Sequence, residues 1–149
     1  ELAPSAQARR ALWVVNQYAF NETFASAYLS LCHERAETTL ARAALRELLS
    51  DEIDHARVGW AYLDSMSKEL AAVVQDWLVP LAVCNLREWR KVRLDDGAPM
   101  SLVKHGIPEA GAVEEALIAA LSDLIVPGMA HVGLDPTALV RWIRDGAET

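Results

Sequence analysis

The sequence predicts an all-α protein, an antiparallel bundle of four main helices with a short C-terminal helix. Apolar residues recur at intervals of three and four along almost the whole chain of 149 residues, which is the period of an amphipathic helix. The chain has no stretch of alternating apolar and polar residues bounded by turn residues, the pattern that would indicate a strand. Since 52% of the residues are apolar, the chain can bury one sizeable core, and residues 1–149 are expected to form a single helical domain.

The first two helices are expected to form a long hairpin. The first spans about residues 4–35 and begins at a proline, which suits the first turn of a helix. Glu37, Thr38 and Thr39 offer a threonine cap at the turn. The second helix is then expected over about residues 40–64.

The second half of the chain contains the stronger helix-breaking signals. A third helix is expected over residues 68–94, with Pro80 kinking or dividing it, because proline lacks an amide donor and clashes with the preceding turn. Residues 95–107 are expected to form a loop because they are rich in glycine and proline. A fourth helix opens at Pro108 and is expected to stop at the Pro127-Gly128 break. The short terminal helix is expected to begin at Asp135-Pro136, a cap followed by proline, and to end before Gly146.

The net charge and the lengths of the apolar runs disfavour nucleic-acid and membrane partners, and the cysteines indicate a compartment. A net charge of −7 disfavours nucleic acid, whose binders usually present a basic face. No apolar run approaches the roughly 20 residues that a membrane crossing needs, so no membrane partner is expected. Cys32 and Cys84 lie far apart and form no CxxC pair, which fits a reduced, cytoplasmic setting.

Three residues of the predicted hairpin form a candidate metal site. Glu52 and His55, three residues apart on one helix, are separated by about 60° around its axis and roughly 4.5 Å along it, so they can reach one ion together. Glu22 lies 15 residues before position 37 and Glu52 lies 15 residues after it. A hairpin that turns near Glu37 therefore brings both carboxylates to the same height. The sequence predicts Glu22, Glu52 and His55 as metal ligands.

The surroundings of these residues decide between a site and a solvated helix face. An Asp-Glu-Ile-Asp-His run is most often solvated, and an isolated histidine is usually a hydrogen-bonded core residue. Here, however, the inward stripe of the second helix places the pair among apolar residues, and Glu22 has similar neighbours. Burying carboxylates in this way is costly unless a cation compensates. The residues of the stripe are Leu45, Leu48, Glu52, His55, Gly59 and Tyr62.

The motifs Asn21-Glu22-Thr23 and Asp51-Glu52-Ile53-Asp54-His55-Ala56, with Trp60 five residues beyond the histidine, resemble those of the ferritin-like superfamily. The resemblance implies a di-iron carboxylate bundle, with manganese as the alternative metal. It implies that Glu22 is a terminal or bridging ligand, Glu52 a bridge and His55 a terminal nitrogen ligand. The implied chemistry is oxygen- or peroxide-dependent oxidation of a small organic substrate or of ferrous iron. The alternative function is a non-catalytic helical interaction module that retains this fold.

The sequence supplies only half of a two-metal site. A complete centre takes a carboxylate and a Glu-x-x-His from each of two helix pairs, and this chain has one such set. Glu88 and Asp123 are the nearest substitutes on the later helices. Three explanations stay open: a homodimer that joins two half-sites, a missing N-terminal helical half of a longer protein, or a single-metal or degenerate site.

Other polar and aromatic residues have simpler explanations. Asp51 and Asp54 could orient His55, but exposed acids beside an arginine are the commoner case. Tyr18 and Tyr62 need no role beyond packing. The two cysteines and the five tryptophans are expected on buried faces, and the basic cluster over residues 87–93 suits the negative end of a helix dipole. No catalytic residue is assigned.

Overall fold

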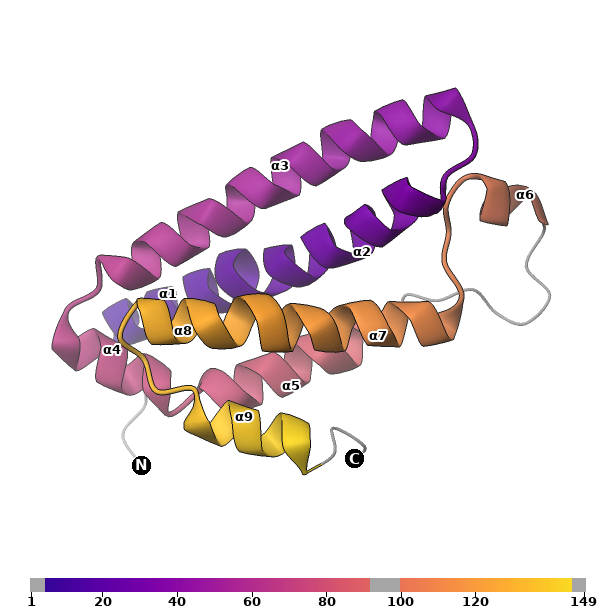
Figure 1. The fold of residues 1–149 in the computed structure, drawn as a ribbon. Helices are drawn as coiled ribbons and strands as arrows, with labels where there is room; N and C mark the ends of the chain where they lie inside the picture. The colour runs from indigo at the N-terminus through magenta and orange to yellow at the C-terminus, as the bar shows by residue number, and fades with distance from the viewer. Residues whose placement is uncertain (1–4, 92–99, 146–149) are drawn as a thin grey trace.

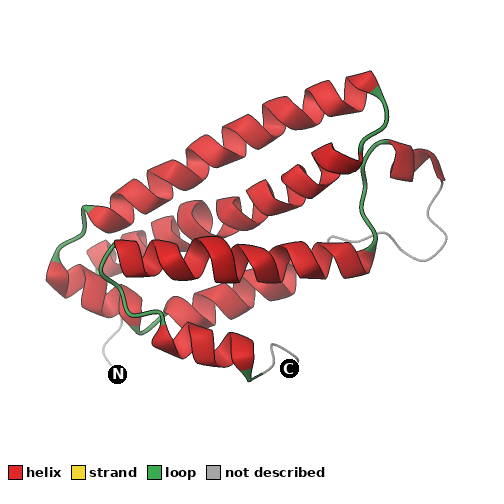
Figure 2. Ribbon diagram, viewed as in Figure 1, coloured by secondary structure: helices red, strands yellow, loops and turns green. Residues whose placement is uncertain are grey.

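The computed structural model describes residues 5–91 and 100–145 of the chain, and in this part the protein is all-α, as predicted. Figure 2 shows helices and loops and, within these residues, no strand. Two helices are interrupted by π-helical segments, labelled η1 and η2. The elements are α1 (Ala6–Val14), η1 (Val15–Asn21), α2 (Glu22–Arg35), α3 (Thr39–Asp64), α4 (Lys68–Gln75), α5 (Leu78–Trp89), α6 (Met100–Lys104), α7 (Ala110–Ala120), η2 (Leu121–Ile125), α8 (Val126–His131) and α9 (Thr137–Arg144).

The predicted hairpin is confirmed. The segments α1, η1 and α2 form one long helix whose first turn is capped by Ser5, because its hydroxyl accepts a bond from the Ala8 amide. The predicted start at Pro4 lies outside the described residues. After a turn at residues 36–38, Thr38 caps α3 by accepting a bond from the Ala41 amide at 3.3 Å. The two long helices then run antiparallel (Figure 1).

The third predicted helix is divided, as its proline suggested. The segments α4 and α5 meet at a bend of 53°. The break falls at Asp76 and Trp77, just before Pro80, which cannot donate the amide bond that would continue the helix through this point. The helix ends at Trp89, and the expected continuation over residues 92–94 lies outside the described residues.

Two expectations for the next segments were wrong. Residues 100–104, expected as loop, form the short helix α6. The fourth helix does not stop at Pro127 but continues to His131. The π-helical segment η2 ends two residues before this proline, and its wider turn relieves the clash that a proline ring makes with the preceding turn of a regular helix. Gly128 lies against the ring of Trp60, where a Cβ atom would come within 2.8 Å of a ring carbon.

The C-terminal helix forms where the sequence placed it. Pro136 precedes the first residue of α9, Thr137, and Asp135 just before it accepts a bond from the Thr137 amide at 2.9 Å. The side chain of Gln75 holds this turn against the end of α4, because it donates to the carbonyl of Asp135 and accepts from its amide, both at 2.8 Å. The helix ends at Arg144.

The core is built mainly from the long first helix, α5, α7 with η2 and α8, and α9. The largest side chains without exposed surface in this core include Phe20, Phe24, Leu86, Leu117 and Met129. The helix α3 lies along one edge of the molecule, packs mainly on η1 and α2 (Figure 1), and adds Leu63 to the core near its C-terminal end. One long side of α3 is therefore covered and the rest is open.

Among the described residues, no single helix has the length and apolar character needed to cross a membrane. In residues 5–91 and 100–145, α4 and α5 taken together across their bend are the one pair that reaches that length and composition.

Candidate metal centre

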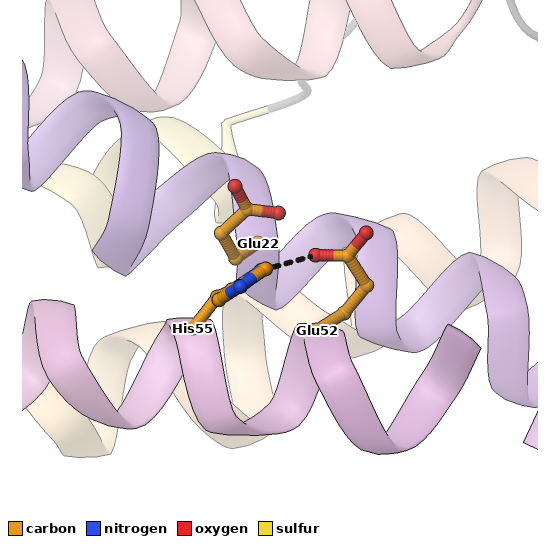
Figure 3. Close-up of side chains that lie close together, drawn as sticks. All are labelled: Glu22, Glu52 and His55. Atoms are coloured by element: carbon orange, nitrogen blue, oxygen red, sulfur yellow. Dashed lines mark hydrogen bonds and ion pairs between the residues drawn. The ribbon is translucent and has the colours of Figure 1, made fainter. Parts of the chain in front are cut away.

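The structure brings together the three residues that the sequence singled out. Glu22 begins α2, while Glu52 and His55 lie one turn apart on α3, and one ligand atom from each lies within 4.8 Å of the others. Figure 3 shows the three side chains meeting in the space between the two helices. His55 Nδ1 lies 3.1 Å from Glu52 Oε2, within hydrogen-bond distance.

The hairpin explains why the two carboxylates lie at the same height. Both helices leave the turn at residues 36–38, and Glu22 and Glu52 are equally far from it, so the same rise per residue brings them level. Near the site the two backbones almost touch. A Cβ atom on Gly59 would lie 2.4 Å from the Ala19 nitrogen and from the Tyr18 carbonyl carbon, so only glycine permits this approach.

A π-helical segment directly precedes Glu22. In it, side chains five residues apart share a face: Gln17 Nε2 donates to Glu22 Oε1 at 3.5 Å. On another face, Asn16 and Asn21 are also five apart, and their side-chain oxygens accept bonds from Asn85 at 2.8 Å and Trp89 at 3.0 Å. The two donors lie four residues apart on α5, as a regular helix requires.

Neither this π-helical segment nor the role of Gln17 was predicted. The burial pattern of the helix reflects this segment. Ala11, Val15, Ala19, Phe20 and Phe24 have no exposed surface, so the residues four and five positions after Val15 both face the core. Phe24 follows Phe20 by four, which moves the core face on by one residue, and π-helical insertions are frequent at functional sites.

The electrostatics of the cluster favour a bound cation. Burial, the hydrogen bond to Glu52 and the repulsion from its charge together raise the pKa of Glu22 to about 7. The hydrogen bond to Glu52 raises the pKa of His55, and the nearby acids act in the same direction. Two carboxylates this close resist joint ionisation without a positive charge between them. A divalent cation would supply that charge.

The site is less buried than the sequence indicated. The His55 side chain is 53% exposed and that of Glu52 26%, and Leu48 of the predicted inward stripe is 51% exposed. The prediction of a charged pair enclosed by apolar residues was wrong because α3 packs mainly on η1 and α2, so the flank of its stripe stays uncovered near the site. The site is an edge of the hairpin open to solvent.

The secondary candidates lie mostly on the surface. Asp54 forms an ion pair with Arg57 at 2.7 Å, and both side chains are exposed. This agrees with the simpler expectation of an exposed acid beside an arginine. Tyr18 meets the His55 ring edge-on, with ring centroids 6.3 Å apart, and Tyr62 packs against the core. Cys32 is buried.

Several aromatic and acidic residues differ from expectation. Cys84, Trp13 and Trp77 are exposed, although the sequence placed them on buried faces. Glu88 is a surface residue paired with Lys91 at 2.6 Å. In residues 5–91 and 100–145, the cluster of Glu22, Glu52 and His55 is the only group of three ligand-type side chains close enough to share an ion. The described part of the chain therefore contains one candidate set of metal ligands.

Comparisons of the chain with protein-family models, curated proteins and solved structures find no match. The chemistry of this site therefore provides the evidence for function.

Proposed function

We propose that this protein binds iron, or alternatively manganese, through Glu22, Glu52 and His55, and that the bound metal reacts with oxygen or peroxide. One observation carries the proposal: two carboxylates and an imidazole from neighbouring helices converge within 4.8 Å. Carboxylates suit manganese and imidazole suits iron, and their mixture is the donor set of di-iron and di-manganese helical bundles.

The proposed architecture is a ferritin-like four-helix bundle in which α1–α2 and α3 form the metal-binding pair. Its support is the motif itself, a glutamate on one helix and Glu-x-x-His on its antiparallel neighbour. A cytoplasmic location belongs to the same proposal, since Cys32 and Cys84 are both free thiols.

The residues of this chain would perform three tasks. Glu22 and Glu52 would neutralise and hold the cation, and loss of the Glu22 proton would accompany binding because its pKa is raised in the metal-free protein. His55 would add a neutral nitrogen ligand, and its exposure leaves a path for a small molecule to the metal. The chemistry that a reduced metal would supply at these residues is electron transfer to dioxygen or peroxide, for the oxidation of an organic substrate or of ferrous iron.

Metal binding by matched variants tests the proposal. Purified metal-free protein is mixed with ferrous iron or Mn²⁺ under anaerobic conditions, desalted and analysed for metal. We expect close to one metal per chain for the wild type and at least a tenfold loss of affinity for Glu52→Ala and His55→Ala. Asp54→Ala is the control, because Asp54 lies between the two ligands in sequence but is exposed and paired with Arg57.

The second measurement addresses the chemistry. Adding oxygenated buffer to the iron-loaded wild type is expected to oxidise the iron faster than buffer alone, and the His55→Ala variant is expected to lose this acceleration. Equal metal content in all four proteins, or none in any, would contradict metal binding and favour the alternative, a non-catalytic interaction module.

A further inference from the structure

The half-site has donors on one side only. Glu22, Glu52 and His55 approach from the α2–α3 hairpin, and the opposite side is open to solvent. Iron and manganese bound by oxygen and nitrogen commonly take about six donors. Within the described residues, this chain offers no further cluster of ligand-type side chains that reaches the open side.

Exposed large apolar side chains lie near the site on both helices. Leu48 lies two helical turns before His55 and is 51% exposed, and Val58 lies one turn after it and is 59% exposed. On the neighbouring helix, Trp13 is 57% exposed and meets Tyr18 edge-on, and Tyr18 in turn meets His55. The three exposed side chains, Trp13, Leu48 and Val58, are called the rim here. Apolar groups clustered around polar ligands are typical of an interface.

The charge of this face argues against association without metal. This face contains the carboxyl groups of Glu22, Glu52 and the exposed Asp51, and the whole chain has a net charge of −7. Two such faces repel each other unless cations lie between them. A partner with the same donor set and the same rim would complete the metal ligands and cover the exposed apolar side chains. An identical chain related by a twofold axis is such a partner.

From these observations we infer that a second copy of this chain docks on the rim, face to face, and that the two Glu-Glu-His sets join into one two-metal centre. The inference rests on the proposed function. It adds that association is linked to metal: the metal-free protein is monomeric, and the loaded protein is a dimer with one metal per chain. Metal held between subunits stabilises the dimer by mass action, in the same way that any ligand stabilises the state that binds it.

Sedimentation velocity with and without Mn²⁺ tests the inference, because Mn²⁺ fills the site without oxidation during the run. The wild type is expected to change from monomer to dimer when Mn²⁺ is added, and His55→Ala is expected to stay monomeric. Val58→Glu and Leu48→Glu each place a charge on the rim and are expected to raise the dimer dissociation constant at least tenfold. Val140→Glu is the matched control, since Val140 is 42% exposed on α9, at the edge of the molecule opposite α3 (Figure 1).

Each outcome has a definite meaning. A wild type that holds Mn²⁺ and stays monomeric overturns the inference and leaves the proposed metal site standing. A dimer that forms equally without metal, or equally in His55→Ala, also overturns it. A wild type that binds no Mn²⁺ and no iron removes the proposed function and the inference together. Metal-linked dimers of the wild type and Val140→Glu, weakened in the two rim variants, support it.

Discussion

Replacing Gly59 by alanine tests the packing that holds the two helices of the site together. The added Cβ atom would lie 2.4 Å from the Ala19 nitrogen and 2.8 Å from the Tyr18 oxygen, whereas ordinary contacts begin near 3.4 Å. These are backbone atoms and cannot rotate away. The helices must therefore separate locally by about 1 Å, and overpacking of this kind costs about 1–3 kcal/mol, occasionally more.

The net effect includes a gain from helix propensity. Alanine favours a helix interior over glycine by about 1 kcal/mol, which offsets part of the clash. Because both contacts are to backbone, we place the clash at about 3 kcal/mol and expect the free energy of unfolding to fall by about 2 kcal/mol. In a chain of this size that lowers Tm by about 4–8 °C. The separation also moves Glu22 away from Glu52, so metal affinity is expected to fall as well.

Gly111→Ala is the matched control. Gly111 also lies in a helix, α7, but a Cβ atom there meets nothing within 4 Å. This variant is expected to gain up to about 1 kcal/mol. Urea unfolding followed by circular dichroism measures both variants. If Gly59→Ala is as stable as Gly111→Ala and binds metal as the wild type does, the close approach of α3 to η1 is refuted.

Three further predictions concern the metal-free protein. The pKa of Glu22 in the folded protein, about 7, exceeds its ordinary value of 4.5, so the folded state keeps this proton to a higher pH than the unfolded state. Urea unfolding is therefore expected to show the free energy of unfolding falling by about 1–2 kcal/mol from pH 4.5 to 7.5, after allowance for solvent screening. The Glu22→Gln variant is expected to flatten this pH dependence. Trp60→Ala removes a half-buried ring that touches α2 and α8, and it is expected to lower the free energy of unfolding by about 2–3 kcal/mol. Trp13 is exposed, so Trp13→Ala is expected to lower it by less than about 1 kcal/mol. Glu114→Gln weakens a partly exposed pair in which Arg90 Nε donates at 2.8 Å, and thermal unfolding is expected to show a loss of about 0.5–1 kcal/mol.

The helical hairpin and the meeting of its carboxylates could be predicted because both depend on local rules. Helix period, a threonine cap and a constant rise per residue determine where a chain turns and which positions are level. Glu22 and Glu52 follow from the position of the turn alone. The cap at Thr38, the bond to Asp135 at the start of α9 and the division near Pro80 belong to the same group of local rules.

Exposure at the site could not be predicted from the same rules. An apolar stripe indicates which face of a helix prefers burial, but not whether another helix is present to cover it. Leu48 fits the stripe of α3 and is nevertheless 51% exposed, because α3 packs mainly on η1 and α2. The continuation of the fourth helix through Pro127 was missed for a related reason. A proline stops a regular helix, and the neighbouring π-helical segment is not a feature of composition.

The direction of Glu22 shows how strongly one inserted residue affects the site. In a regular helix, seven residues make about two turns, so Glu22 would lie almost directly above Val15. Val15 has no exposed surface, and that face is the core. The π-helical segment between them acts as an insertion of one residue and rotates Glu22 by about 100° relative to Val15, toward α3. Phe20 and Phe24 take the core positions that follow Val15, so the same insertion keeps the core apolar and brings the carboxylate to its edge, beside Glu52 and His55.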